Sequence, residues 1–129
     1  MTTPIDMLPR LEELALEAGV AIMKIYVEDF VTEYKDDQSP VTEADTAAEN
    51  IIIAGLKTIS PDIPIVAEEA FTAGHSPDIS GGKFWLVDPL DGTQEFVRKN
   101  GEFTVNIALI ENGQAICGVV YAPALGKIY

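Results

Sequence analysis

The sequence has little of several features that would assign it to a common functional class. Only 8 of its 129 residues are Lys or Arg, against 21 Asp or Glu, which gives a formal net charge of -13. A charge of this sign disfavours a nucleic-acid polymer or an anionic membrane as partner, because their phosphates would be repelled. No run reaches the roughly 18 apolar residues of a membrane-spanning helix, so we expect no integral membrane segment.

Cysteines and export signals are equally scarce. Cys117 is the one cysteine, so no disulfide forms within the chain, and a reducing compartment is compatible with this composition. The first residues lack the basic segment followed by an apolar segment that is typical of a signal peptide. We therefore expect a cytoplasmic protein and leave association with a membrane surface open.

Two helices are predicted from apolar residues that recur every three or four positions. The first spans Leu8 to about Val27, with its regular part starting near Pro9, because a proline is tolerated in a first turn. The second starts near Thr42 and ends at about Ile59. Between and after the helices we expect short strands at 30–34, 63–66 and 84–87 and loops at 35–40 and 72–83.

A β-hairpin is the clearest structural prediction near the C-terminal end. Two apolar runs, 104–111 and 114–121, flank Asn112-Gly113, a dipeptide that favours the positive φ values of a two-residue turn. Both faces of each run are largely apolar, which predicts a hairpin deep in a sheet with material packed on both sides. Residues 127–129 look like the opening of another strand.

Two carboxylates three positions apart, Asp88 and Asp91, follow a buried apolar run and are the main candidates for a functional site. Pro89 fixes φ and turns the chain, so that Asp91 can point to the same side as Asp88. The two carboxylates and the Leu90 carbonyl between them form a set of hard oxygen ligands suited to Mg2+.

The next residues could hold a phosphate. If a helical turn begins at Asp91, the N–H groups of Gly92 and Thr93 point at an anion. Lys35 could contact a phosphate too, although such a residue is more often a solvated surface lysine. The alternative is an ordinary strand, turn and helix, with Asp91 as N-cap and Asp88 as a solvated turn residue.

Two further acidic segments are weaker candidates. Glu68 and Glu69 follow the strand at 63–66, and only one of them can easily join a cluster, because adjacent residues of an extended chain point to opposite faces. Thr42 and Asp45 have the spacing of a capping box. In the functional interpretation, Asp45 instead orients the Thr93 hydroxyl, which orients an attacking water.

In this order the segments resemble the inositol monophosphatase superfamily of Mg2+-dependent, lithium-sensitive phosphatases. The matching residues are Lys35-x-Asp37-x-Ser39-Pro40-Val41-Thr42-x-Ala44-Asp45, Glu68-Glu69 and Trp85-x-x-Asp88-Pro89-Leu90-Asp91-Gly92-Thr93. Within it, the CysQ-type branch of 3'(2'),5'-bisphosphate nucleotidases is similar at Glu95-Phe96, 100–110 and 118–123.

The resemblance implies a site that holds two or three Mg2+ ions. Glu68, Asp88 and the Leu90 carbonyl would bind the first ion, and Asp88 and Asp91 would contribute to the second. The substrate would be a small phosphorylated molecule, with adenosine 3',5'-bisphosphate converted to AMP and phosphate. An inositol monophosphatase or another sugar-phosphate phosphatase is the alternative, and a non-catalytic domain that binds a divalent cation is a second alternative.

Catalytic roles are implied in the same way. Thr93 with Asp45 would activate the attacking water, while the backbone N–H groups of Gly92 and Thr93, together with Glu68, would contribute to substrate binding. Glu69 would assist at the edge of the site.

The resemblance also implies an α/β fold, with two long helices packed on a mainly antiparallel sheet. Residues 1–129 would form the N-terminal metal-binding domain, one half of an αβαβα sandwich. Members of the superfamily are about twice as long, and a Trp-Asp-x-x-Ala-Gly motif that completes their second metal site is not found here. We therefore expect this piece alone to be inactive, and its uncovered apolar surface to favour a homo-oligomer.

Overall fold

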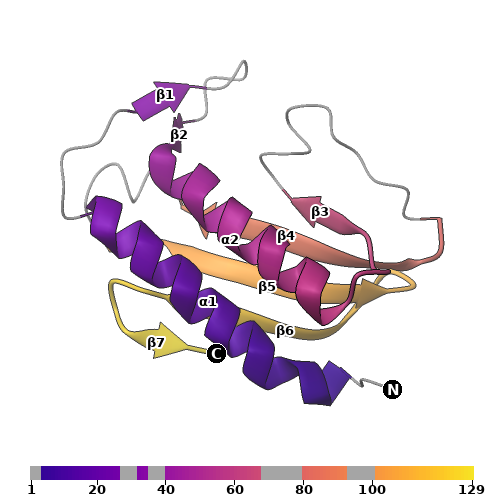
Figure 1. The fold of residues 1–129 in the computed structure, drawn as a ribbon. Helices are drawn as coiled ribbons and strands as arrows, with labels where there is room; N and C mark the ends of the chain where they lie inside the picture. The colour runs from indigo at the N-terminus through magenta and orange to yellow at the C-terminus, as the bar shows by residue number, and fades with distance from the viewer. Residues whose placement is uncertain (1–3, 27–31, 35–39, 68–79, 93–100) are drawn as a thin grey trace.

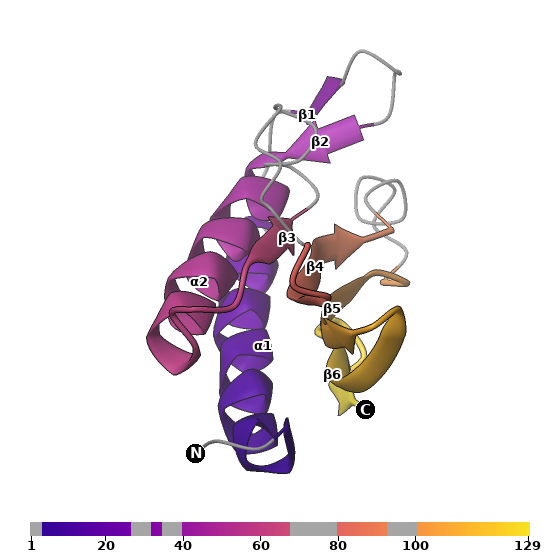
Figure 2. The same cartoon turned by 90° about the vertical axis from the view of Figure 1, so that its right-hand side faces the viewer.

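The computed structural model describes residues 4–26, 32–34, 40–67, 80–92 and 101–129. Helices α1 (Pro4–Tyr26) and α2 (Glu43–Ile59) lie side by side on one face of a five-stranded sheet (Figures 1 and 2). The predicted arrangement of two long helices on a mainly antiparallel sheet is therefore confirmed. No helix in the described ranges combines the length and apolar character needed to cross a membrane.

The main sheet has the order β3-β4-β5-β6-β7. Strands β3 and β4 are parallel, and every other neighbouring pair is antiparallel. The bounds are β3 (Ile65–Ala67), β4 (Lys83–Asp91), β5 (Thr104–Glu111), β6 (Gln114–Ala122) and β7 (Lys127–Ile128). The strand expected at 127–129 is thus present, and β5 is the central strand.

A separate two-stranded sheet precedes α2. It pairs β1 (Thr32–Tyr34) with β2 (Pro40–Thr42) in antiparallel register. The predicted loop over 35–40 is wrong at Pro40, which pairs with Tyr34. A proline is compatible with the first position of a short edge strand, where its missing N–H costs little.

Helix α1 begins earlier than the apolar pattern predicted. It starts at Pro4, so Pro9 lies inside the helix rather than in its first turn. A proline at the first helical position has a suitable φ and lacks only an N–H that would have no helical partner. Pro9 removes one further bond near the helix start, and the remainder of α1 compensates through its packing.

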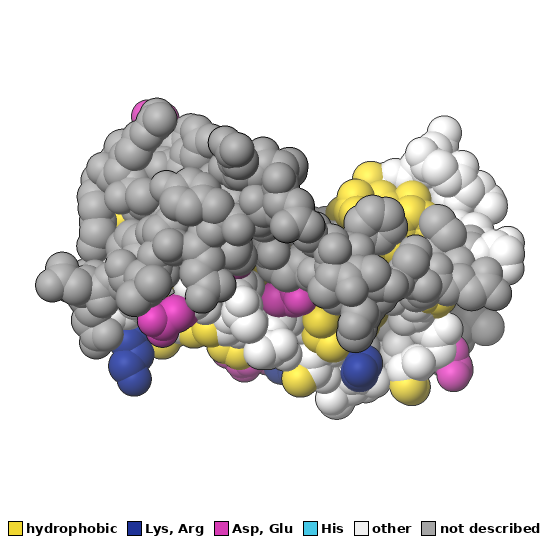
Figure 3. All heavy atoms as spheres, turned by 90° about the horizontal axis from the view of Figure 1, so that it is seen from above, with side chains coloured by type: hydrophobic (Ala, Val, Ile, Leu, Met, Phe, Trp, Pro, Cys, Tyr) yellow, Lys and Arg dark blue, Asp and Glu magenta, His cyan; other side chains and the backbone are white. Residues whose placement is uncertain are grey.

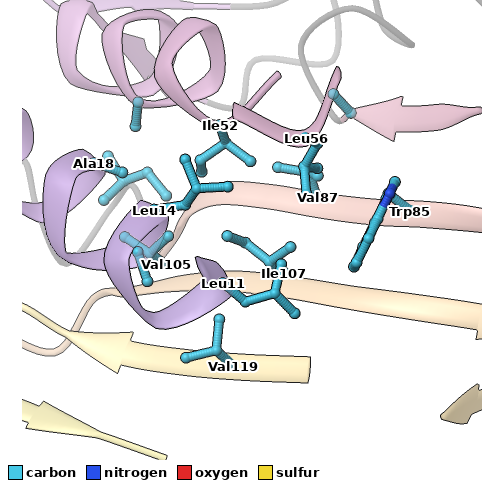
Figure 4. Packing of buried hydrophobic residues seen from close by; sticks show 14 of the residues in the cluster. Leu11, Leu14, Ala18, Ile52, Leu56, Trp85, Val87, Val105, Ile107 and Val119 are labelled. Carbon is cyan, nitrogen blue, oxygen red and sulfur yellow. The ribbon is translucent and has the colours of Figure 1, made fainter. Parts of the chain in front are cut away.

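The core lies between the helices and the sheet (Figure 4). Helix residues at three- and four-residue spacing meet alternate residues of the strands, as the two periodicities require. The buried side chains labelled there are Leu11, Leu14, Ala18, Ile52, Leu56, Trp85, Val87, Val105, Ile107 and Val119. The Trp85 indole N–H donates a 2.8 Å hydrogen bond to the Ser60 hydroxyl, which satisfies its polar atom within this apolar layer.

Two helical glycines allow close packing. A Cβ at Gly55 of α2 would lie 2.0 Å from Leu14 Cδ2, and one at Gly19 of α1 would lie 2.4 Å from the Tyr121 ring. The absence of these side chains brings α1 close to α2 and to β6. The glycines therefore set the spacing of the helical layer.

The predicted hairpin turn is confirmed. Asn112 and Gly113 have φ values of 51° and 81°, as a two-residue turn of this type requires. The Asn112 N–H also donates a 2.7 Å hydrogen bond to the Gly82 carbonyl. The turn is thereby attached to the residue just before β4, where Lys83 pairs with Glu111.

The expectation of packing on both faces of the hairpin is not met within the described residues. Val120 of the hairpin and Leu86 of the neighbouring strand β4, both on the face opposite the helices, are 39% and 46% exposed. The neighbouring residues in sequence, Val87 and Val119, are buried against the helices. The two faces of the sheet are therefore unequal, and the open face is still apolar.

Candidate functional site

Asp88 and Asp91 both lie within β4, which extends four residues beyond the predicted strand end at Val87. Asp88 pairs with Asn106 and Asp91 pairs with Thr104, with a register shift between them. Three steps along β4 therefore match two steps along β5, so β4 contains one extra residue, a β-bulge.

The bulge explains how two aspartates three positions apart share a face. In a regular strand such residues would point to opposite faces, since side chains alternate. One extra residue restores the alternation, and the opposing residues Asn106 and Thr104 are two apart on β5. The predicted orientation of Asp91 toward the side of Asp88 is therefore supported, and the bulge is its cause.

The residues inside the bulge are buried. Leu90 is 1% exposed and belongs to the apolar core, so its side chain cannot serve as a ligand and the predicted ligand role falls to its backbone carbonyl. Pro89 occupies a position at which a ladder hydrogen bond is already interrupted, which is where a strand tolerates proline.

Asn106 lies beside both aspartates, and sequence reasoning did not identify it. Its Nδ2 donates a 3.2 Å hydrogen bond to Asp91 Oδ2. Its Oδ1 is buried and has no hydrogen-bond partner among the residues that the structure describes. The available signal was a single amide within the apolar run of β5.

The helical turn expected to begin at Asp91 is wrong. Asp91 is the last residue of a strand, and Gly92 has a φ of 90°, outside the right-handed helical region. A residue with a side chain would be strained in this conformation, which accounts for glycine here. An N-cap role for Asp91 at Gly92 is excluded for the same reason, and Thr93 lies outside the described residues.

Asp45 lies in the first turn of α2 and is only 1% exposed. Helix α2 starts at Glu43, so the spacing of Thr42 and Asp45 still fits a capping box. A carboxylate is favoured near a helix N-terminus, but a capping residue is usually solvated, whereas burial of a charge requires compensating partners. The burial of Asp45 is therefore compatible both with capping and with the predicted role at the site.

The N-terminal end of α2 and the C-terminal end of β4 lie at the same end of the layered structure (Figure 1). Glu49, one turn after Asp45 on the same side of α2, is also buried, at 7% exposed. Sequence reasoning did not single out Glu49, although an acid between Ala48 and Ile52 interrupts the apolar stripe. Two buried carboxylates on one helix are therefore directed toward the interior at this end.

Several predicted site residues cannot be placed. Lys35, Glu68, Glu69 and Thr93 lie outside the described residues. Strand β3 ends at Ala67, which pairs with Val87, and the next residues in sequence are Glu68 and Asp88. In the described ranges, no three His, Cys, Asp or Glu side chains come together as a metal site.

The described oxygen atoms fit a hard cation. Two carboxylates on one face, the Leu90 carbonyl and the buried Asn106 Oδ1 are the donor types that Mg2+ prefers. Among the described residues on the face seen in Figure 3, a few Asp and Glu side chains lie next to apolar ones.

Cys117 does not belong to this group of oxygen ligands. It lies on β6, pairs with Leu109 of β5 and packs against the core. Burial raises the pKa of the Cys117 thiol, while a backbone hydrogen bond involving Leu109 and the charge of Lys83 act in the opposite direction. The thiol therefore resists ionisation, which suits a packing residue rather than a nucleophile.

Comparison with known proteins decides the family. The model of the inositol monophosphatase family matches residues 6–129. The chain belongs to the inositol monophosphatase family. The resemblance found in the sequence motifs is thus confirmed.

The most informative relatives are nucleotidases and phosphatases. A Salmonella typhimurium protein named 3'(2'),5'-bisphosphate nucleotidase CysQ is 52% identical over 125 residues, which cover 95% of this chain and 50% of that protein. The Escherichia coli K12 protein of the same name is 49% identical. The chain spans about half the length of the curated relatives that it matches.

Solved structures agree on the fold. The structure of CysQ from Bacteroides thetaiotaomicron has a TM-score of 0.74 and 38% identity, and covers 93% of this chain and 43% of its own. The Thermotoga maritima IMPase has a TM-score of 0.82 and 32% identity, and covers 95% of this chain and 46% of its own.

Proposed function

We propose that the complete gene product containing this chain is a Mg2+-dependent 3'(2'),5'-bisphosphate nucleotidase that converts adenosine 3',5'-bisphosphate to AMP and phosphate. The observation that carries the chemistry is the bulged end of β4, which places Asp88 and Asp91 on one face beside Asn106. The identity of about half the residues to proteins named CysQ supports this substrate over others.

The carboxylates would hold the cations. Asp88, Asp91 and the Leu90 carbonyl, with Glu68 as a further predicted ligand, would bind two or three Mg2+ ions. Bound Mg2+ would supply positive charge for the phosphate oxygens and lower the pKa of an attacking water. A bound cation dominates the local field, so an acidic chain can accept a phosphorylated substrate.

Asp45 and Thr93 would act together on the attacking water. The Thr93 hydroxyl would orient the attacking water, and Asp45 would accept a hydrogen bond from that hydroxyl and favour its correct orientation. The buried position of Asp45 at the start of α2 supports this role, because a shielded carboxylate interacts more strongly with its neighbours. The Gly92 N–H would donate to the phosphate.

The test compares two substrates with the complete gene product. Phosphate release from adenosine 3',5'-bisphosphate should exceed release from inositol monophosphate in Mg2+ and should stop when a chelator is added. Asp45→Asn keeps the side-chain shape and should lower kcat by roughly 100-fold or more, since positioned proton transfer contributes on that scale. Ala108→Ser, on the same sheet but outside the proposed machinery, serves as the control.

An inositol monophosphatase is the second candidate, and the TM-score of 0.82 with the Thermotoga maritima IMPase favours it. A faster reaction with inositol monophosphate would establish this candidate. Stabilisation by Mg2+ without turnover of either substrate would instead favour a non-catalytic cation-binding protein. A cytoplasmic location forms part of the main proposal, since the single cysteine of these 129 residues requires no oxidising compartment.

A further inference from the structure

We propose that Asn106 is a positioning residue of this site. Its side-chain amide would orient Asp91 toward a cation, and its side-chain oxygen Oδ1 would accept a hydrogen bond from a water bound to that cation. The inference rests on the proposed function and extends it to a residue on β5. Asn106 stands directly opposite Asp88 in the register of β4 and β5. It lies on the central strand of the sheet, so its backbone is held on both sides.

The donor end of the side chain acts on Asp91. Asn106 Nδ2 lies 3.2 Å from Asp91 Oδ2. The opposite orientation of the amide would place two oxygen atoms against each other, so the carboxylate itself decides which atom donates. One carboxylate oxygen is engaged, and the other remains available to a cation.

A neutral donor is suited to this task. A lysine or arginine at the same place would hold Asp91 equally well, but its charge would compete with a cation for the carboxylate. The amide fixes the orientation of the carboxylate and leaves its negative charge intact. Hydrogen-bonded partners of this kind commonly orient metal-binding carboxylates.

The acceptor end points to the same conclusion. Asn106 Oδ1 is buried and lacks a partner among the described residues. A buried acceptor without a donor is destabilising, so a donor at this position would be favourable. Asn106 lies between Val105 and Ile107 of β5, and a hydrated cation beside Asp88 and Asp91 would bring water as that donor.

The experiment measures Mg2+ binding to the complete gene product by calorimetry, and unfolding temperature with and without Mg2+. Asn106→Ala should weaken Mg2+ binding by about 10-fold, the scale on which such partners act. Its unfolding temperature without Mg2+ should stay the same or rise, because the unsatisfied acceptor is removed. Ala108→Ser, two residues further along the same face of β5, should leave both quantities unchanged.

Asn106→Asp provides a second variant with a distinct signature. The added charge beside Asp91 should lower the unfolding temperature without Mg2+ and increase the stabilisation that Mg2+ provides. If Asn106→Ala does not fold, Asn106→Thr gives the same comparison, since it retains strand preference but is too short to reach Asp91.

The outcomes separate this inference from the proposed function. If the parent protein binds Mg2+ and Asn106→Ala binds it within twofold, the positioning role is refuted and the proposed function stands. If the parent protein itself fails to bind Mg2+, the proposed function is refuted as well.

Discussion

Replacement of Gly55 by alanine should have two opposing effects on the stability of the fold. Alanine is favoured over glycine by about 1 kcal/mol in a helix interior. The new Cβ, however, would lie 2.0 Å from Leu14 Cδ2 and 2.9 Å from Leu14 Cγ. Rotation about the Leu14 Cβ–Cγ bond alone cannot relieve the second contact, so Leu14 must change its χ1 rotamer within the packed core or the two helices must separate.

The destabilisation caused by the clash should exceed the stabilisation caused by the helix preference of alanine. Overpacking of a core typically costs about 1–3 kcal/mol, and the shortness of this contact places it near the upper end. After the helix preference is subtracted, Gly55→Ala should lower the free energy of unfolding by about 1–2 kcal/mol. Displacement of α2 should also reduce kcat, because this helix carries Asp45.

Urea denaturation of the complete gene product measures this effect against two references. Ala54→Gly, at the exposed neighbouring position, should cost about 1 kcal/mol and calibrates the helix preference in the same segment. In a Leu14→Ala background the clash is absent, so Gly55→Ala should be stabilising there. A Gly55→Ala protein more stable than the parent would refute the proposed packing argument.

Three further predictions concern the site, the hairpin and the cysteine. Asp88→Asn should remove most of the Mg2+-dependent stabilisation, which amounts to about 2.7 kcal/mol at 100 times the Kd; thermal unfolding with added Mg2+ checks this, and an unchanged shift would show that Asp88 is not a ligand. Gly113→Ala should cost about 1 kcal/mol because of the positive φ at Gly113, whereas Gly81→Ala, where a Cβ meets nothing within 4 Å and no positive φ is imposed, should cost less in the same denaturation assay. Cys117 should be alkylated more slowly in the folded than in the unfolded protein at equal pH, since burial raises its pKa and reduces the thiolate fraction; iodoacetamide kinetics on both states test this rate difference, and equal rates would contradict it. The stabilising effect of the neutral thiol is complete below its ordinary pKa and is lost as pH rises through the raised pKa.

Elements with strong local signals could be predicted from the sequence. The apolar stripe of α2 and the Asn112-Gly113 turn require nothing beyond nearby residues, and both were found at the expected places. The start of α1 was harder, because Pro4 and Pro9 are both compatible with a first turn. The pairing of β2 with β1 was missed, since a three-residue strand has no readable period.

The site was predictable as a set of residue types but not as a geometry. The spacing of Asp88 and Asp91 suggested a metal corner, yet the bulge that aligns them arises from pairing with β5. Asn106 became significant only through that same pairing, which no local pattern displays. The helical turn at Asp91 was wrong because pairing with β5 extends β4 to that residue and Gly92 has a φ of 90°.

The hydrogen bond between Asn112 and Gly82 links the far end of the sheet to the alignment of the proposed site residues. It joins the hairpin turn to the start of β4. The register of β4 and β5 then continues without interruption from this end to the pair of Asp88 and Asn106. A slip of one residue would turn Asn106 toward the helices and present an aliphatic side chain to Asp88. A change that shifted this register would therefore lower cation affinity and turnover at the proposed site, although no group near the substrate had been altered.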